Sequence, residues 1–293
     1  KNTGKPFDVL KNDMERDKFM TAEEAAELIP NGATVGMSGF TGAGYPKAIP
    51  GALAKRIGKI NETGGRFRIN VWTGASTAPE LDGALAEVDG IEMRLPFQTD
   101  PICRNRINDG RMDYVDYHLS EVSQYAWSGF LGKMNLAVIE VAGIREDGSL
   151  IPSSSIGNNK TWIEQADKIL LEVNSAQNIR MEGMHDVYYG TALPPNRKPI
   201  MLTNPSDRIG EQYLHCPIDK VIGVVETNAP DRNSPFKAPD DVSKKIAGHI
   251  MDFFDREIEA GRLPKELLPI QSGVGNIPNA VLEGLDEGPY KNL

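Results

Sequence analysis

Short apolar runs rich in β-branched residues alternate along the chain with turns and with stretches of helical periodicity. Six such runs lie at residues 33–40, 67–74, 91–97, 135–144, 168–173 and 220–227. The first three end in small or polar residues that lead directly into a predicted helix. This repeated order of strand, turn and helix predicts an α/β fold with an open, mainly parallel sheet and flanking helices.

The turns after the predicted strands are the places to look for chemistry, because ligands of parallel α/β sheets bind beyond the carboxyl ends of the strands. Four turns concentrate glycine and small polar residues: SGFTGAG (38–44), TGAST (73–77), FQTDP (97–101) and PSSSIGNN (152–159). The turns should lie along one side of the molecule. We expect the strands to end at or near Gly39, Gly74, Phe97 and Gln271.

The pattern also predicts how the chain is divided. Residues 1–17 are polar and without pattern, and Thr21 and Glu24 have the spacing of a capping box at a helix start. Residues 227–241 are rich in Pro, Asn and Asp, and beyond them apolar residues recur in the stripe of an amphipathic helix. We predict an N-terminal arm (1–17), an N-terminal domain (18–227), a linker (228–241) and the start of a truncated second domain (242–293).

Composition and charge narrow the possible functions. The 293 residues carry a formal net charge of −9, which argues against a nucleic-acid partner because such a protein needs a basic face. Cys103 and Cys216 form no CxxC pair and the four histidines have no metal spacing, so no metal site is expected. No apolar run approaches the roughly 20 residues that span a bilayer. We expect a cytoplasmic protein with no membrane partner.

Four motifs follow one another in a characteristic order: SGFTGAGYPKAIP (38–50), TGAST (73–77), EDGSLIPSSSIGN (146–158) and HIMDFFDREIEAGRLPKELLPIQSGVGNIPNAVLEGL (249–285). With these motifs the chain resembles, from about Thr21 to Leu293, the acetyl-CoA hydrolase/transferase family of coenzyme A transferases. Within that family it is most similar to the succinyl-CoA:acetate type. Relatives that act on 4-hydroxybutyrate or butyrate typically carry Gly-Gly where this chain has Gly275-Asn276, which favours the short-acid subgroup.

The resemblance implies two tandem open α/β domains, an active site between them and a ping-pong reaction through a glutamyl-CoA thioester. It implies an acyl-CoA and a short-chain carboxylate as substrates and no cofactor, with coenzyme A itself a substrate; a homodimer is expected. In relatives the nucleophilic glutamate follows an Asn-Leu pair by about five residues. The nucleophile is therefore expected just past Leu293, and this chain alone is expected to be inactive. Glu283 and Glu287 are interpreted as helix surface and polar turn.

The loop IQSGVGN (270–276) also suggests a role through its own chemistry. Attack on a thioester creates an oxyanion, and a pre-aimed backbone N–H lowers that barrier by roughly 3 kcal/mol. Glycines flank Val274 and permit a sharp turn, while the following helix adds a positive partial charge. The alternative is a plain strand-to-helix turn. We predict Val274 N–H, with Gly275, as the oxyanion donor, Asn276 as substrate-binding, and contacts to CoA from Ile270, Gln271, Ser272, Gly273 and Val274.

Other candidates belong to the expected acyl pocket. Phe40 lies in a glycine-dense loop that is neither GxGxxG nor a P-loop, which disfavours NAD. Ser76 and Thr99 place hydroxyls at successive strand ends, where they either donate to a substrate carboxylate or cap the next helix. Ser154 and Ser155 have the same two possible roles, and for them capping is favoured.

More than one function class remains open. The first is an acyl-CoA:carboxylate CoA-transferase that moves CoA between short acids, with acetyl-, succinyl- or propionyl-CoA as donors. An acetyl-CoA hydrolase is a close variant, because it differs only in whether the closed site excludes water. A non-catalytic α/β domain that binds a small anion is the alternative from another class. A sugar-phosphate isomerase is disfavoured, since the loops offer no acid/base pair.

Overall fold

The computed structural model describes residues 16–204, 206–233, 238–267 and 270–290. The chain divides into two compact units, one of residues up to 202 together with 207–233, the other of residues 203–206 together with those from 234 onward. Residues 1–15 of the predicted arm and residues 234–237 of the predicted linker lie outside the described residues. The units are therefore described one at a time.

The first unit is built around one sheet. Its strands are β1 (Thr34–Met37), β2 (Ile69–Trp72), β3 (Ile91–Leu95), β4 (Asp113–Tyr114), β5 (Met134–Ile144), β6 (Leu150–Pro152), β7 (Ala166–Asn174) and β8 (Val221–Thr227). Their order is β4-β3-β2-β1-β5-β7-β8 with parallel pairing throughout, and β6 pairs antiparallel with β5. The expected open, mainly parallel sheet is confirmed.

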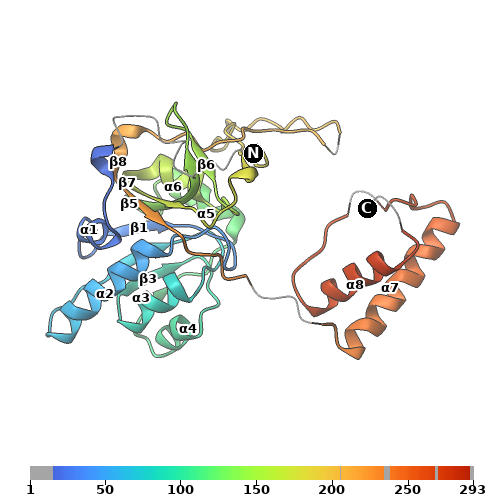
Figure 1. Cartoon of the computed structure of the whole chain (residues 1–293), viewed down its shortest axis with the longest axis horizontal. Coiled ribbons are helices and arrows are strands. Elements are labelled where there is room, and N and C mark those ends of the chain that lie inside the picture. The colour runs from blue at the N-terminus through green and yellow to red at the C-terminus, as the bar shows by residue number, and fades with distance from the viewer. Residues whose placement is uncertain (1–15, 205, 234–237, 268–269, 291–293) are drawn as a thin grey trace, which may run out of the picture. The chain divides into compact units, whose positions relative to one another are not determined.

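Helices cover both faces of this sheet. Figure 1 shows α2, α3 and α4 on one side of it and α5 and α6 on the other. The helical elements of this unit are η2 (Arg16–Lys18), α1 (Ala22–Glu27), α2 (Ala48–Glu62), the π-helical turn η3 (Pro79–Gly83), α3 (Ala84–Glu87), α4 (Pro101–Asn108), α5 (Leu119–Trp127), α6 (Asn159–Gln165), η4 (Ile179–Met181) and η5 (Ile218–Lys220).

Two apolar clusters fill the layers between sheet and helices. Val71 of β2 packs with residues of α1 to α4, while its neighbour Trp72 packs with residues of α5 and α6. Val138 and Ile139 of β5 divide between the clusters in the same way. Successive side chains of a strand point to opposite faces, so a strand covered on both sides must be apolar at nearly every position. This is why the apolar runs could be recognised as strands.

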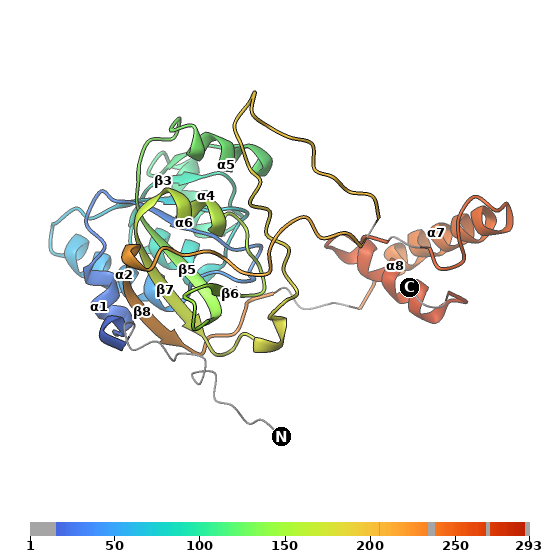
Figure 2. The ribbon, with the colours of Figure 1, turned by 90° about the horizontal axis from the view of Figure 1, so that it is seen from above.

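The start of α1 has the capping interaction that the sequence predicts. Thr21 and Glu24 form the predicted capping box at the start of α1, with Glu24 N–H donating to Thr21 Oγ1 at 3.1 Å and Thr21 N–H to Glu24 Oε2 at 2.8 Å. β7 and β8 lie side by side (Figure 2), and the described part of the long connection between them holds the short helical turns η4 and η5.

The second unit contains α7 (Asp241–Glu259) and α8 (Asn276–Glu287), packed around Leu267, Leu285 and Tyr290. The predicted amphipathic helix is confirmed as α7. The strand expected to end near Gln271 is wrong for the described residues: 270–273 form none, and Leu268 and Pro269 lie outside them. A strand needs a neighbour to pair with, and the described residues of this unit supply none. No helix in the described ranges is both long and apolar enough to cross a membrane.

Candidate active site at the carboxyl edge of the sheet

The strand order reverses between β1 and β5, and crevices at such points are where open α/β sheets bind ligands. The turns that leave β1, β2 and β5/β6 meet there. Thr41 N–H donates to Ser76 O at 2.8 Å, Asn158 N–H to Ser38 Oγ at 2.8 Å, and Asn158 Nδ2 to Thr73 O at 3.3 Å. For the turns of the first unit, clustering on one side is confirmed; the turn near Gln271 belongs to the second unit.

Ser76 and Thr99 lie in direct contact. Their hydroxyl oxygens are 2.8 Å apart, and Thr99 N–H donates to Ser76 Oγ at 2.9 Å. Neither caps a helix, because Asp100 caps α4 and the helical turn after Ala78 has no side-chain cap. The capping alternative is therefore wrong for both. Ser76 is buried and Thr99 is exposed, so the pair reaches from the sheet edge to the surface. Their role as carboxylate donors stays a prediction.

Phe40 stands at the same edge. This residue is 51% exposed, and its N–H and C=O pair with those of Ala43 at 2.9 and 3.0 Å to close a tight turn. Thr41, Gly42 and Gly44 all have positive φ in this turn. Thr41, the residue after Phe40, is hydrogen-bonded to the backbone of Ser76. The three predicted substrate-binding residues of this unit, Phe40, Ser76 and Thr99, therefore lie near one another.

Ser154 and Ser155 act differently from the favoured expectation. Neither caps α6, whose N-cap residue Asn158 makes no side-chain cap bond. Ser155 Oγ instead donates to Ala43 O at 2.8 Å, and Ser154 Oγ donates to the carboxylate of Asp231. The capping interpretation is wrong because each hydroxyl has an acceptor from another segment within reach. Ser155 ties the turn after β6 to the glycine-dense loop, and Ser154 ties it to the segment after β8.

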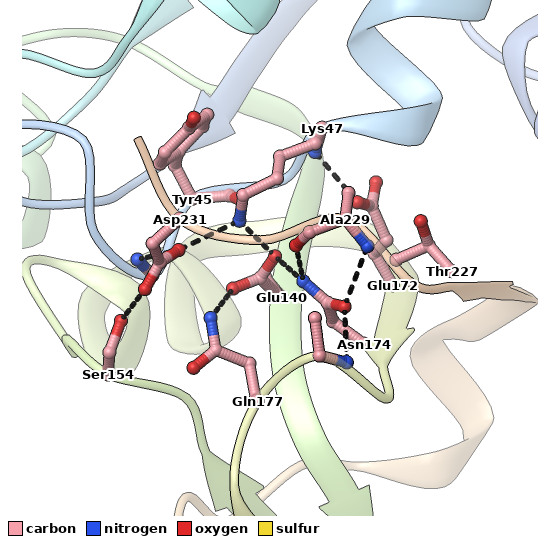
Figure 3. Close-up of polar contacts among 12 residues, drawn as sticks. Tyr45, Lys47, Glu140, Ser154, Glu172, Asn174, Gln177, Thr227, Ala229 and Asp231 are labelled. Carbon is pink, nitrogen blue, oxygen red and sulfur yellow. Dashed lines mark hydrogen bonds and ion pairs between the residues drawn. The ribbon is translucent and has the colours of Figure 1, made fainter. Parts of the chain in front are cut away.

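A buried charged network, which sequence reasoning missed, lies behind this loop (Figure 3). Lys47, at the start of α2, directs its ammonium group to Glu140 Oε2 at 2.6 Å, to Asp231 Oδ1 at 3.0 Å and to Tyr45 O at 2.8 Å. An ammonium group has three N–H donors, so all of them have acceptors. The Lys47 and Glu140 side chains are almost fully buried.

Glu140 of β5 is held by more than the lysine. Asn174 Nδ2 donates to its Oε2 at 2.8 Å and Gln177 Nε2 to its Oε1 at 3.0 Å. Burial raises the pKa of Glu140 to about 7, even though the Lys47 charge and these hydrogen bonds act to lower it; the neighbouring Glu172 adds to the rise. This carboxyl therefore titrates near neutral pH.

Glu172 of β7 lies beside Glu140 in register and binds the amino terminus of α2. Its carboxylate accepts from the N–H groups of Lys47, Ala48 and Ile49 at 2.7, 2.9 and 3.0 Å. The next residue is Pro50, which has no N–H to donate. One buried carboxylate thus satisfies every backbone donor of the first turn, and it also meets the positive end of the helix dipole.

The segment after β8 completes the network. Asp231 Oδ1 accepts from Gly44 N–H at 3.0 Å; burial alone would raise its pKa, but the hydrogen bonds from Ser154, Gln177 and Gly44 together with Lys47 hold it below its usual value. Arg232 N–H donates to the carbonyl of Gly42 at 2.8 Å. A Cβ on Gly42 would lie 2.4 Å from Arg232 O, and its φ is +90°. The residue there must be glycine for both reasons.

One signal in the sequence could have revealed these groups. The run NLAVIEVAGI holds a single charged residue, Glu140, and the run KILLEV holds Glu172 in its apolar part, after the exposed Lys168 at its start. A strand that is buried on both faces has no solvent-facing side for such a residue. Each therefore requires an internal partner, and the partner cannot be identified until the fold brings Lys47 and α2 to the same edge.

In the second unit, the predicted CoA-contacting residues 270–273 line a cavity of about 460 Å³, whose remaining walls are apolar side chains of α7, α8 and the segment between them. Val274 is 88% exposed and points its side chain outward. Gly275 has φ +141° and is the N-cap residue of α8, and Asn276 is the first residue of that helix. The loop therefore enters a helix as expected, whereas the roles of its residues in oxyanion and CoA binding stay predictions.

These sequence and structural features agree with comparisons to known proteins. Residues 10–194 match the acetyl-CoA hydrolase/transferase N-terminal domain, and the chain belongs to this family. The family expected from the motifs is confirmed. Among the described residues, no group of three or more His, Cys, Asp or Glu side chains could hold a metal ion.

Three curated relatives show what the chain is similar to. It is 44% identical over 278 residues to a succinyl-CoA:acetate CoA-transferase of Clostridium kluyveri, covering 95% of this chain and 51% of that protein. It is 40% identical to a propanoyl-CoA:succinate CoA transferase of Escherichia coli (92% and 55% covered) and 39% identical to an acetyl-CoA hydrolase of Neurospora crassa (94% and 53% covered). The chain spans about half the length of the curated relatives it matches.

Solved structures confirm the fold. RipA from Yersinia pestis aligns with a TM-score of 0.64 at 21% identity, covering 94% of this chain and 55% of that one. A 4-hydroxybutyrate CoA-transferase from Porphyromonas gingivalis aligns with a TM-score of 0.51 at 17% identity, covering 92% and 52%. At these identities the likeness concerns the fold alone.

Proposed function

We propose that this chain is part of an acyl-CoA:carboxylate CoA-transferase that moves CoA between short acids such as acetate, succinate and propionate. The observation that carries the proposal is the Ser76–Thr99 hydroxyl pair beside the exposed ring of Phe40, at the switch point of the sheet. Hydroxyls bind a carboxylate without a fixed charge that would retain the product, and a ring beside them suits a short apolar chain. The names of the relatives agree with this substrate class.

The proposed reaction uses a glutamate nucleophile. Its carboxylate attacks the thioester carbonyl of the acyl-CoA, CoA leaves as a thiolate, and an acyl-glutamyl anhydride remains. The thiolate then attacks the glutamyl carbonyl of the anhydride, which releases the free acid and forms a glutamyl-CoA thioester. Val274 N–H would stabilise the oxyanion of each attack, a contribution of roughly 3 kcal/mol per barrier.

We further propose that the nucleophile lies about five residues beyond Leu293. The relatives are about twice as long as this chain, so residues past this point are part of the proteins whose names carry the activity. Glu283 lies in α8 and Glu287 is its last residue, with no nucleophilic role proposed for either.

Intact-protein mass spectrometry tests this assignment. After incubation with acetyl-CoA, a chain of residues 1–293 should show no covalent adduct, because covalent catalysis needs its nucleophile. A protein extended to the length of the relatives should gain the mass of CoA less one water, and peptide mapping should place it on a glutamate just past Leu293. An adduct on Glu283 or Glu287 would overturn the assignment.

Acetyl-CoA hydrolase is the second candidate, favoured by relatives of that name at about 40% identity. In that reaction water resolves the same covalent intermediate, so the difference is how well the closed site excludes water. CoA release should be measured with and without added acetate or succinate on the extended protein. Strict dependence on the acid supports the transferase, and release without acid supports the hydrolase.

A further inference from the structure

A fully buried ion pair lies behind the two hydroxyls. Asp82, in the helical turn η3, and Arg94, in β3, both have no exposed surface. They bind each other at two points, with Arg94 Nε 2.8 Å from Asp82 Oδ1 and Arg94 Nη2 3.0 Å from Asp82 Oδ2. A parallel pair of contacts of this kind fixes the orientation of both groups as well as their distance.

Each member of the pair also binds the backbone of one turn. Asp82 Oδ2 accepts from Thr77 N–H at 3.2 Å, in the turn after β2. Arg94 Nη1 donates to Leu95 O at 2.5 Å, at the end of β3, and the same carbonyl accepts from Thr73 N–H at 3.0 Å. A closed series of contacts therefore connects the two turns from inside the protein.

The hydroxyls sit on these same two turns. Ser76 is the neighbour of Thr77, and Thr99 follows Leu95 by four residues. Their contact at 2.8 Å tolerates little change, since a hydroxyl–hydroxyl hydrogen bond is lost when the distance between the oxygens increases by about 1 Å. The spacing of the hydroxyls thus depends on the spacing of the turns.

Stability alone is a poor explanation for the pair. Taking two charges out of water is costly, and apolar side chains of similar volume often serve a protein core as well or better. What apolar side chains cannot do is bind Thr77 N–H and the carbonyl of Leu95. The ion pair is therefore better explained by the backbone groups that it binds than by its contribution to stability.

We propose that Asp82 and Arg94 are positioning residues for carboxylate binding: they hold the turns after β2 and β3 at the separation at which the buried Ser76 hydroxyl donates to Thr99 Oγ1 and the exposed Thr99 hydroxyl donates its own proton to the acid. This inference rests on the proposed function of the hydroxyl pair. Neither residue contacts the substrate, and both act through the backbone of the turns.

The test replaces the pair in a protein extended to the length of the relatives. The double variant Asp82→Leu/Arg94→Met fills the space with apolar groups and so preserves a packed core. Its KM for acetate as acceptor should rise roughly tenfold, the effect of about one lost hydrogen bond to a charged group. The KM for the acyl-CoA should change by less than about twofold, because most of that substrate lies away from the hydroxyls.

A mutant cycle separates positioning from loosening of the fold. Ser76→Ala alone should raise the acetate KM by a similar factor. Added to the double variant, it should raise the KM by less than about twofold further, since the hydroxyl is already misplaced and the effects are not additive. Full additivity would show that the pair does not act through Ser76.

The chain contains a matched control. Arg68 and Asp89 form an ion pair just before the starts of the same strands, β2 and β3, at the opposite edge of the sheet. Arg68→Met/Asp89→Asn removes that pair, with asparagine chosen because Asp89 has φ +58°. This variant should keep the acetate KM of the unmodified protein whatever it does to the melting temperature.

A folded double variant with an unchanged acetate KM would overturn the inference if Ser76→Ala raises that KM. If the double variant does not fold, Arg94→Lys keeps the charge without the planar fork, and an unchanged acetate KM in that variant is equally decisive. If the unmodified protein transfers no CoA, the proposed function fails instead. A crystal structure of either variant then decides the inference alone: a Ser76–Thr99 contact still at 2.8 Å refutes it.

Discussion

Glu140 is a carboxyl group buried among partners that come from four different segments. Lys47, Asn174 and Gln177 bind it, while Glu172 on the neighbouring strand and Asp231 across the lysine add negative charge nearby. Of these three carboxyl groups, Glu140 and Asp231 contact the one ammonium group, and Glu172 binds backbone N–H groups beside it. Burial raises the pKa of Glu140 to about 7 under these conditions. A proton on Glu140 is the simplest way to reduce the excess negative charge.

The stability of the protein should therefore depend on pH through this residue. The pKa of Glu140 is about 7 when folded against a model value of 4.5, so the folded state binds a proton that the unfolded chain releases between these values. Its contribution to the free energy of unfolding is fully present below 4.5 and is lost as the pH rises to about 7, by up to about 3 kcal/mol.

Urea unfolding of the unmodified protein and of Glu140→Gln checks this expectation. The variant cannot titrate at this position. Its free energy of unfolding should therefore increase relative to that of the unmodified protein as the pH rises from about 5 to about 8. A difference between the two proteins that is constant across this range would show that Glu140 keeps one protonation state in the folded protein.

At the scale of the element, the apolar pattern predicted where the strands and helices lie. It did not predict the polar contacts that stabilise their ends. All six predicted runs are strands, because burial on both faces makes the run continuous. β4 and β6 were missed, since two and three residues are too short to show a pattern. The strand near Gln271 was predicted from the apolar run before the glycine-rich turn, without evidence of a pairing partner.

The candidate site could be predicted only in part for a related reason. Ser76 and Thr99 were recognisable because each follows directly from the end of a strand. Lys47 and Glu140, by contrast, are separated by 93 residues in the chain, and no local pattern relates them. Contacts between residues so far apart in the chain depend on the order of the strands in the sheet, and the apolar pattern does not determine that order.

Capping of α2 offers a prediction at this scale. Glu172→Gln keeps the shape of the side chain but turns an NH2 group toward backbone donors, so it should lower the free energy of unfolding by about 1–3 kcal/mol. Asp240→Asn is the matched control at α7, where the exposed carboxylate accepts from Ser243 N–H and asparagine caps equally well. Equal losses in the two variants, measured by urea unfolding, would contradict the importance of the buried cap.

At the scale of the whole molecule, the apolar clusters respect the division into two units. The two clusters of the first unit use residues between 19 and 225, and the cluster of the second uses residues between 251 and 290. The segment Ala229–Asn233 belongs to the first unit and binds it through Asp231 and Arg232. The boundary of independent folding should therefore lie after this segment rather than at the end of β8.

Two fragments test where that boundary lies. Residues 1–233 should unfold cooperatively on heating, because the fragment keeps both clusters and the Lys47–Asp231 contact. Residues 1–228 should melt roughly 5 °C lower, since Lys47 and Gly44 lose an acceptor inside the protein. Identical melting temperatures, measured by circular dichroism, would show that the segment contributes nothing to the first unit.

The carboxylate of Glu172 also determines what the glycine-dense loop can recognise. In nucleotide-binding α/β proteins, the free N–H groups that open the helix after such a loop receive a phosphate. Here the protein fills that position with its own anion, and Pro50 removes the one remaining donor. A phosphate at this helix would find the donors of the first turn already occupied. The loop is therefore glycine-rich like a phosphate-binding loop, but the helix that follows it has no free first-turn donor for a phosphate, which leaves this crevice to small acids that neutral hydroxyls can bind.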